Sequence, residues 1–315
     1  MKKKIVVFGG GTGLSGLLKG LKDFPVDLTA VITVSDNGRS TGKLREEFYT
    51  PAVGDIRKVL SNLSELPEEI KNIMEYRFNT YSDLDGHPLG NLVLTAMLNQ
   101  TKNLKTSIEY LSKLLDVKHK ILPLSEDYLT LMGETIDGEI IEGEEQLTKA
   151  HKQYKRIFYK EKPHVEKEVL TAIQKADLII LSMGSLYTSI LPHILCKEVR
   201  ETIKKSKANV MYLCNAVTQP GETDHFGVSD HIKILEKYLG KNTIDVVIAS
   251  NSIIDHRILK KYKIEEQKDP VLIDYDNLKE MNIELIEDNL LTIVDNTIRH
   301  NSLKISSIIF SYLMR

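Results

Sequence analysis

Residues 4 to 16 of the chain read Lys-Ile-Val-Val-Phe-Gly-Gly-Gly-Thr-Gly-Leu-Ser-Gly. The first five residues predict a buried strand, and in the turn that follows Gly11, Gly13 and Gly16 have the spacing G-x-G-x-x-G. Glycines let the backbone approach an anion closely, and the helix expected from Leu14 to Leu21 directs its first N–H groups at that anion. The turn therefore predicts a site for a nucleotide or another phosphorylated ligand. The alternative is that these glycines only pack a strand against a helix.

Length and composition are those of an ordinary globular protein. The 315 residues are 42% hydrophobic, enough to bury a large core in one big α/β domain or two smaller ones. The formal net charge of −2 leaves no excess of Lys and Arg for a long phosphate backbone, so we expect no nucleic acid partner. Cys196 and Cys214 fit neither a metal knuckle nor a disulfide framework and predict reduced thiols. Because no stretch approaches a signal-peptide core or a membrane span of about 20 apolar residues, we expect a cytoplasmic protein.

Short runs rich in β-branched residues alternate with helical patterns along the chain. These runs are Lys4–Phe8, Leu28–Val34, Leu178–Ser182, Val210–Cys214 and Val246–Ala249. Alternation of this kind is typical of an α/β fold whose helices cover both faces of a parallel sheet. The sequence therefore predicts a Rossmann-like, doubly wound, mainly parallel sheet.

A different pattern separates the second of these runs from the third. Residues from about 54 to 116 are helical in pattern, and three β segments follow, the first two joined by the turn Asp137-Gly138. The three segments are Tyr128–Ile136, Glu139–Glu142 and Lys155–Tyr159. We expect one α/β domain over residues 1–315, with an inserted helical and β-hairpin subdomain from about 54 to 165. The apolar segment Ile298–Leu313 is expected to dock as a helix.

Every unusual cluster of glycine or small polar residues comes directly after one of the five predicted strands. The clusters are Gly9–Gly16, Ser35–Gly42, Met183–Ser189, Asn215–Thr223 and Ser250–Ser252. Any one of them is explained equally well as a simple turn, since Asn, Ser, Gly and Pro are common turn formers. The carboxyl ends of parallel strands, however, meet at one edge of the sheet, where ligands bind in open α/β folds. Five clusters at that edge favour a ligand site.

Six motifs in the chain carry a resemblance to a known family. They are Gly-Gly-Gly-Thr-Gly-Leu (9–14), Ser-Asp-Asn-Gly-Arg-Ser-Thr-Gly-Lys-Leu-Arg (35–45), Gly-Asp-Ile-Arg (54–57), Gly-His-Pro-Leu-Gly-Asn (86–91), Gly-Ser-Leu-Tyr-Thr-Ser-Ile-Leu-Pro (184–192) and Cys-Asn-Ala-Val-Thr-Gln-Pro-Gly-Glu-Thr (214–223). Over the whole chain they resemble the YvcK-type gluconeogenesis factors of the CofD-like superfamily. The resemblance implies a bacterial protein that binds UDP-sugars and supports cell shape and wall synthesis during gluconeogenic growth. Enzymatic relatives, the 2-phospho-L-lactate transferases, join phospholactate to a deazaflavin from a guanylylated donor.

The motifs and clusters together give the predicted ligand-binding residues. These are Gly9, Gly10, Gly11, Thr12, Gly13, Leu14, Asp36, Asn37, Ser40, Asp55, Arg57, His87, Asn91, Gly184, Ser185, Leu186, Tyr187, Thr188, Asn215, Gln219, Gly221, Glu222, Thr223, Asn251, Tyr262 and Arg299. We expect a diphosphate on Gly10–Gly13, ribose hydroxyls near Asp36 and the sugar near Asn215. Arg299 is a candidate phosphate clamp and Tyr262 a candidate for stacking on a base. A solvated helix-end charge and a half-buried helix tyrosine are the respective alternatives.

Several of these residues have a structural alternative of the same weight. His87 precedes a predicted helix, where it is either an acid or base beside a phosphate or only part of the helix cap. Asp55 and Arg57 either lie beside the ligand, as the resemblance implies, or simply pair with each other or cap a helix. No residue qualifies as a covalent nucleophile, because Ser185 lacks the glycine spacing of a nucleophile elbow and neither cysteine lies in an activating motif.

The chain departs from the family pattern in two places. The family usually has Asp-Asp-Gly-Gly-Ser-Ser-Gly where this chain has Asp36-Asn37-Gly38-Arg39-Ser40-Thr41-Gly42, so one carboxylate is an amide here. Because Mg²⁺ favours anionic oxygen ligands, the change places a magnesium cofactor in doubt, and we predict binding that needs no metal. Near the end, the family's Arg-His-Asp is Arg299-His300-Asn301.

Three functions remain open from the sequence. The first is a regulatory protein that binds a UDP-sugar or another small nucleotide, and we expect it to be a homodimer without a membrane span. The second is a transferase of the 2-phospho-L-lactate type, which Asp36 and the superfamily resemblance favour. The third is an NAD-dependent oxidoreductase, which rests on the glycine spacing with Asp36 as the ribose-binding acid and explains only two of the five clusters.

Overall fold

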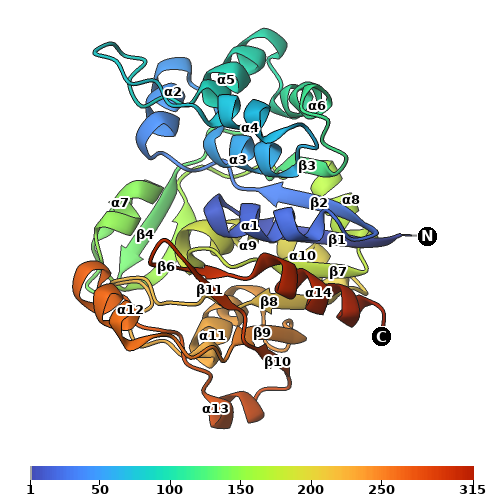
Figure 1. Cartoon of the computed structure of the whole chain (residues 1–315), viewed down its shortest axis with the longest axis vertical. Helices are drawn as coiled ribbons and strands as arrows, with labels where there is room; N and C mark the ends of the chain where they lie inside the picture. Colours follow the sequence, from blue (N-terminus) through green and yellow to red (C-terminus); the bar gives the residue numbers. More distant parts are fainter. Residues whose placement is uncertain (1) are drawn as a thin grey trace.

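The central element of the fold is a parallel sheet of seven strands. The structure is a computed structural model that describes residues 2–315. In Figure 1 the strands follow the order β10-β9-β8-β7-β1-β2-β3. Their bounds are β1 Lys3–Gly9, β2 Val26–Ile32, β3 Lys120–Pro123, β7 Leu178–Leu181, β8 Asn209–Leu213, β9 Val246–Ser250 and β10 Glu284–Asp288. The five predicted strands are confirmed, and β3 and β10 add one unpredicted strand at each edge.

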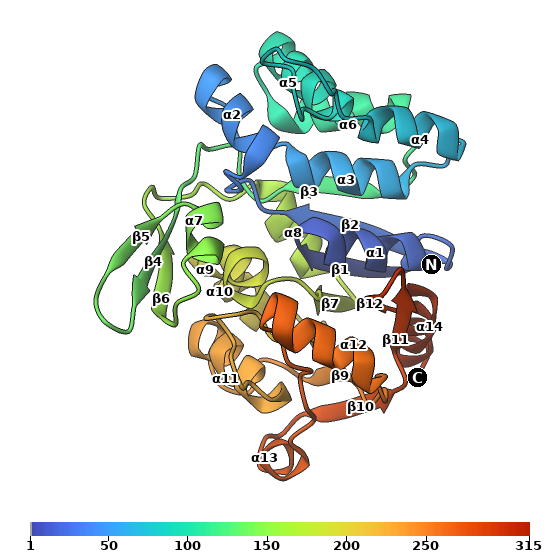
Figure 2. The same cartoon turned by 60° about the vertical axis from the view of Figure 1, so that its left-hand side comes forward.

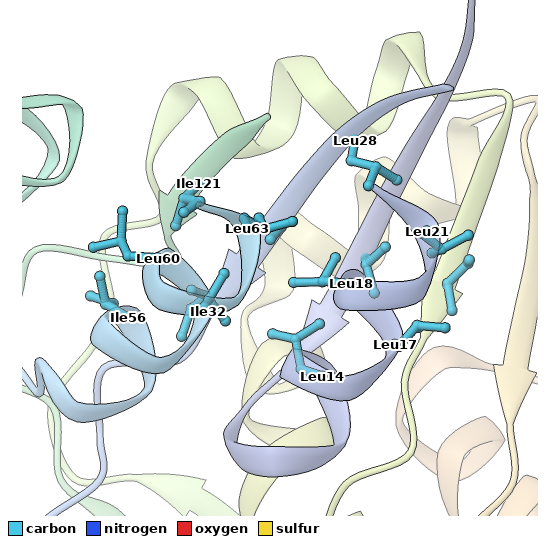
Figure 3. Close-up of a cluster of buried hydrophobic side chains, with 14 of the residues drawn as sticks. Leu14, Leu17, Leu18, Leu21, Leu28, Ile32, Ile56, Leu60, Leu63 and Ile121 are labelled. Carbon is cyan, nitrogen blue, oxygen red and sulfur yellow. The ribbon is translucent and has the colours of Figure 1, made fainter. Parts of the chain in front are cut away.

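Helices cover both faces of the sheet, each over its own hydrophobic core. Side chains of β1 alternate between the two cores, Ile5 and Val7 entering one and Val6 and Phe8 the other. The first core, part of which Figure 3 shows, is closed by α1 (Gly11–Leu21), α3 (Gly54–Leu63), α5 (Leu89–Thr101), α6 (Leu104–Leu114) and α14 (Ser302–Leu313). The second is closed by α8 (Lys167–Lys175), α9 (Leu191–Leu195), α10 (Lys197–Lys205) and α11 (Val228–Leu239). The doubly wound α/β fold is confirmed.

A small antiparallel sheet lies beside the main one, as Figure 2 shows at the left. Its order is β5-β4-β6, and its hairpin turns at Asp137-Gly138, where Gly138 has a φ of +85°. The bounds are β4 Leu131–Thr135, β5 Ile140–Glu142 and β6 Tyr154–Tyr159, with α7 (Glu144–Lys149) between β5 and β6. The helices α2 (Arg39–Phe48) and α4 (Glu68–Glu75) complete the region between β2 and β7. β3 lies in this region but pairs with β2 of the main sheet, so part of the region belongs to the main sheet. The inserted subdomain from about 54 to 165 stays a prediction.

The helix that was predicted at Ile298–Leu313 is wrong at its start. Residues 298–300 belong to β12 (Thr297–His300), which pairs with β11 (Leu291–Val294), and helix α14 begins only at Ser302. It begins there because the Asn301 side chain accepts a hydrogen bond from the Lys304 N–H at 3.0 Å. The remaining elements are the π-helical turns η1 (Leu186–Ile190) and η2 (Tyr262–Glu266) and the helices α12 (His256–Lys261) and α13 (Tyr275–Lys279).

Helix α14 packs closely on α1. A Cβ atom on Gly20 would lie 2.6 Å from the Ser302 carbonyl oxygen, so glycine is required for this approach. Ile305 and Ile309 of α14 are buried in the first core. No helix in residues 2–315 is long and apolar enough to cross a membrane.

Candidate functional site

The N-terminus of α1 already holds a carboxylate of the protein. Gly10 is the N-cap residue, and Gly11 follows with a φ of +61°. The backbone N–H of Gly11 donates to Asp55 Oδ2 at 2.7 Å, and Lys58 Nζ lies 3.0 Å from Asp55 Oδ1. The Gly-Asp-Ile-Arg motif of α3 therefore lies against the glycine turn, and Asp55 stands where the helix dipole favours an anion.

Other glycines of this turn serve packing. A Cβ atom on Gly13 would lie 1.6 Å from the Met183 carbonyl oxygen, and one on Gly9 would lie 2.1 Å from Ser182 Oγ. Both positions bring the turn after β1 against the turn after β7. The Leu14 side chain is buried in the first core. The packing alternative thus explains Gly9 and Gly13, and their contact with a ligand stays a prediction.

A cavity of about 540 Å³ lies between the glycine turn and the C-terminal hairpin. Residues that line this glycine-turn cavity include Thr12, Gly13, Lys19, Arg299, His300 and Ser302. Burial lowers the pKa of His300 to about 4, so its ring is neutral near pH 7 and the positive charges belong to Lys19 and Arg299. Within the described chain, no Asp or Glu lines this cavity. It therefore offers an anion two cations and no opposing carboxylate.

Tyr262 supports the strand that carries Arg299. Its side chain is only 4% exposed, and its hydroxyl oxygen accepts a hydrogen bond from the Ile298 N–H at 2.8 Å. Tyr262 and Arg299, which the sequence predicts to lie in one site, are therefore linked through β12. The ring lies in the interior, and its stacking on a base stays a prediction.

The turn after β2 carries Asp36 and Asn37, whose side chains make different contacts. Asp36 Oδ1 accepts from the Gly38 N–H at 2.9 Å, while burial and then the nearby Asp55 carboxylate raise the pKa of Asp36. Asn37 Oδ1 accepts from the Glu145 N–H at 2.9 Å, and Asn37 Nδ2 donates to Gln146 Oε1 at 2.9 Å. Asn37 thus fastens α7 to this turn.

Ser40, His87 and Asn91 come together from two motifs. Ser40 Oγ lies 2.8 Å from His87 Nδ1, and Asn91 Nδ2 donates to Ser40 Oγ at 3.1 Å. All three residues are buried, and burial, followed by the charge of Lys43, lowers the pKa of His87. In the neutral tautomer with its proton on Nε2, His87 accepts a hydrogen bond from the Ser40 hydroxyl at Nδ1, and Ser40 Oγ accepts one from Asn91. The second turn and the Gly-His-Pro-Leu-Gly-Asn segment form one polar network.

A second cavity, of about 390 Å³, opens at the N-terminus of α2. The lining of this α2 cavity includes Ser40, Arg57, Arg77, Asn91, Glu144 and Lys149. Arg57 is 2% exposed and donates to Glu75. Burial and then the Asp36 and Asp55 charges raise the pKa of Glu144 well above its ordinary value.

Sequence reasoning missed six residues of the α2 cavity, namely Lys58, Arg77, Glu144, Glu145, Thr148 and Lys149. None of them belongs to a motif that the sequence analysis singled out. Glu144 and Lys149 reach the cavity only because Asn37 holds α7 beside the second turn, a contact between residues distant in sequence. Only the tertiary structure reveals them.

The third and fourth turns are joined by hydrogen bonds between their own side chains. Ser185 Oγ donates to Glu222 Oε2 at 3.0 Å, and Gln219 Nε2 donates to Glu222 Oε1 at 3.1 Å. Burial raises the pKa of Glu222 to about 7, against the Ser185 hydrogen bond, which lowers it. Asn215 Nδ2 donates to the Gly184 carbonyl at 2.7 Å. The amide that was expected to bind the sugar is therefore engaged in the scaffold.

Most remaining predicted residues of these turns lie in the interior. The buried ones are Leu186, Tyr187, Thr188, Gly221 and Thr223. Gly221 has a φ of +77°, and a Cβ atom there would lie 1.9 Å from the His151 carbonyl carbon. The exposed Asn251 shares a cavity of about 310 Å³ with Asn215, so the fourth and fifth turns meet.

Two carboxylates, those of Asp36 and Asp55, lie near the first two turns, where a metal ion would need anionic oxygen ligands. Asp36 and Asp55 are close enough for their charges to interact, but Asn37 directs its amide oxygen at α7. Across residues 2–315, no three His, Cys, Asp or Glu side chains are grouped so that they could hold a metal ion. Metal independence stays a prediction.

A comparison with known protein families identifies the family of the chain that carries these turns. The family described as 2-phospho-L-lactate transferase CofD matches residues 5–291. The chain belongs to the CofD family. This CofD-family chain is 42% identical over 313 residues to the gluconeogenesis factor of Bacillus subtilis, covering 99% of the chain and 98% of that protein. A putative gluconeogenesis factor of Thermotoga maritima is 40% identical over 312 residues, covering 97% of the chain and 98% of that protein.

Solved structures agree with the family. An X-ray crystal structure of a protein from Bacillus halodurans matches this CofD-family chain with a TM-score of 0.96 and 42% identity, covering 98% of the chain and all of that protein. A crystal structure of a UPF0052 family member from the same organism gives a TM-score of 0.95 at 42% identity, covering 98% and 99%. The predicted resemblance and the fold class are both confirmed.

Proposed function

We propose that this CofD-family protein is a regulatory factor that binds a UDP-sugar and supports cell shape and wall synthesis during gluconeogenic growth. The observation that carries the proposal is the glycine-turn cavity, which is lined by Lys19 of the last turn of α1 and by Arg299 of β12, with no acidic residue in its described lining. Cations without an opposing carboxylate favour the binding of a diphosphate. The similarity to proteins named gluconeogenesis factors supports the regulatory role.

The position of Asp55 refines where the diphosphate lies. Because Asp55 accepts from the Gly11 N–H, we place the diphosphate between Thr12 and Arg299, beside the helix rather than at its tip. Arg299 is exposed on β12, where its guanidinium can take two phosphate oxygens.

A phosphotransfer enzyme of the 2-phospho-L-lactate transferase type is the second candidate. The observation that favours it is the interaction of the Asp36 and Asp55 carboxylates at the first two turns. Carboxylates beside a nucleotide are the groups that position metal-bound phosphates in transferases. The oxidoreductase alternative has no comparable support in the described residues.

Isothermal titration calorimetry with UDP-N-acetylglucosamine, UDP, GDP and NAD tests the proposal, with EDTA or Mg²⁺ present. We expect UDP-N-acetylglucosamine to bind in EDTA, and Arg299→Gln to weaken it about 10- to 100-fold, the loss of a charge-assisted contact. Arg257→Gln is the matched control, since Arg257 is an exposed arginine of α12 that pairs with Asp255. Equal losses in both variants would contradict the placement. Binding of GDP alone, and only with Mg²⁺, would favour the transferase.

A further inference from the structure

Three consecutive glycines, Gly9 to Gly11, lead from the main sheet into α1. Gly9 is the last residue of β1, and the helix begins at Gly11. Glycine has more backbone freedom than any other residue, so a run of three loses much conformational entropy when it is held in one conformation. Such a turn needs restraints from other parts of the fold if its N–H groups are to point in a fixed direction.

The buried His193 supplies a restraint of this kind. Its side chain is 0% exposed, and its Nε2 atom lies 3.1 Å from the carbonyl oxygen of Gly9. Burial lowers the pKa of His193 to about 4, so the ring is neutral near pH 7. Because a carbonyl oxygen only accepts, the single ring proton is on Nε2. Nδ1 forms no hydrogen bond within the described chain, so the ring is held to the backbone by the Gly9 contact.

The surrounding elements hold His193 itself in place. The residue belongs to the short helix α9, and its ring packs on the ring of Phe8 in β1, with the two ring centroids 5.2 Å apart. Arg200 of α10 donates to the carbonyl oxygens of the last two residues of α9, at 2.8 Å each. Helix α9 is therefore fixed to the sheet on one side and to α10 on the other, and the imidazole approaches Gly9 from a well-packed part of the second core.

The hydrogen bond to Gly9 sets the direction of the next peptide group. The peptide bond between Gly9 and Gly10 is trans and planar, so its carbonyl and its N–H point in opposite directions. A carbonyl that is fixed by His193 therefore fixes the Gly10 N–H as well. Gly10 is the N-cap residue of α1, so the same contact also orients the start of that helix.

We propose that His193 is a positioning residue, which holds the glycine turn in its ligand-binding conformation through the hydrogen bond to the Gly9 carbonyl. Because its side chain is fully buried, His193 acts through the backbone and does not touch the ligand. Loss of the hydrogen bond should loosen the turn and, through the turn, lower the affinity for the ligand.

Two amide variants separate the hydrogen bond from the packing of the ring. The side-chain nitrogen of His193→Gln stands near the position of Nε2, whereas that of His193→Asn stands near Nδ1 and is too short to reach Gly9. Hydrogen exchange of the Gly11 N–H, which Asp55 protects, reports the order of the turn without any ligand. Relative to the amides of β9, we expect exchange at least about tenfold faster than in the wild type for His193→Asn, and within about threefold of it for His193→Gln.

His231 offers a matched control in α11. It is also buried, and its Nδ1 atom lies 2.9 Å from the carbonyl oxygen of Gly227. His231→Gln moves the side-chain nitrogen away from that carbonyl, and we expect it to leave the exchange of the Gly11 N–H unchanged. Arg200→Met, which frees the end of α9, is expected to speed this exchange about threefold and replaces His193→Asn if that variant does not fold.

The proposal rests on the proposed function only where it concerns the ligand. In calorimetry with UDP-N-acetylglucosamine, we expect His193→Asn to bind about 5- to 10-fold more weakly than the wild type, and His193→Gln and His231→Gln to bind like it. Equal exchange of the Gly11 N–H in His193→Asn and His193→Gln, or unchanged affinity in His193→Asn, would overturn the proposal. A wild type that binds no nucleotide sugar would instead overturn the proposed function, and the exchange rates would still decide whether His193 positions the turn.

Discussion

Helices α1 and α2 begin in the same way but differ in what lies at their N-termini. Each follows a parallel strand of the main sheet, and each has a glycine N-cap without a side-chain hydrogen bond. At α1, the Gly11 N–H is taken by Asp55 at 2.7 Å. At α2, the first amides face a cavity with two arginines that have no carboxylate partner in the described chain.

This difference shows that a glycine-rich turn does not by itself locate an anion. The turn after β1 has the better phosphate-binding pattern, yet a carboxylate from α3 occupies its helix end. The turn after β2 has only Gly38 before its helix, and there the carboxylate comes from the turn itself, since Asp36 Oδ1 accepts from the Gly38 N–H at 2.9 Å. A residue distant in sequence therefore lies at one helix end, and a residue of the same turn lies at the other.

Gly13→Ala has the largest expected effect on this comparison. The new Cβ atom would lie 1.6 Å from a backbone oxygen, so we expect a loss of about 3 kcal/mol or more in the free energy of unfolding. Gly11→Ala is the matched change, because its Cβ atom meets nothing within 4 Å and only the φ of +61° opposes it, at about 1 kcal/mol. Urea denaturation measures both. Similar losses for the two variants would refute the packing role of Gly13.

Asp55→Ala is expected to make the end of α1 resemble that of α2. It removes a hydrogen bond to a charged group, so we expect the free energy of unfolding to fall by about 2 kcal/mol. It also frees the Gly11 N–H, whose NMR signal should then shift on addition of phosphate. A variant that leaves this signal unmoved by phosphate would show that Asp55 does not occupy an anion position.

Asn37→Ala tests whether Asn37 holds α7 beside the second turn. The variant loses two side-chain hydrogen bonds to α7, and we expect it to lower the free energy of unfolding by about 1 kcal/mol. Asn37→Asp keeps an acceptor for the Glu145 N–H and should lose less. Urea denaturation measures both variants, and an unchanged free energy of unfolding in Asn37→Ala would show that these hydrogen bonds do not hold α7.

The smallest expected effect concerns pH. Burial raises the pKa of Glu144 and of Asp36, so each gains negative charge only as the pH rises above its ordinary range. Sulfate, which does not titrate here, should therefore bind at α2 a few-fold more weakly once the pH exceeds the raised pKa values of these carboxyl groups than below them. Arg45 opposes this change by favouring the ionised Glu144. Glu144→Gln should flatten the dependence in a calorimetric titration, and an unaltered slope would place Glu144 away from the anion.

The sequence predicts the strands whose side chains are apolar on both faces. The runs from Lys4, Leu28 and Leu178 are continuous because each strand is buried between two helical layers. The edge strands lack this pattern. β3 is four residues long and ends in Pro123, while β10 reads Glu-Leu-Ile-Glu-Asp and is largely accessible. Residues 298–300 were expected to be helical because the apolar pattern of α14 continues into them, and β-pairing with β11 prevails there.

Much less of the candidate site could be predicted. Motifs identify Asp55, Ser40 and Asn91, and the fold does bring them to the first two turns. They do not show that the amide of Asn215 bonds Gly184, or that Glu144 enters the α2 cavity. These contacts depend on which side chains form hydrogen bonds with one another across the sheet edge. Short motifs do not show which side chains do so.

The close packing of α14 on α1 has a consequence for the order of synthesis. A ribosome produces helix α1 well before α14, and the residues that pack on α1 at Gly20 are Ser302 and Ser306 of α14. Until α14 has been synthesised, the apolar side of α1 remains partly uncovered in the nascent polypeptide. We therefore expect ribosome-bound chains that stop before α14 to recruit chaperones and to be cleaved by protease within α1, while chains that include it resist both.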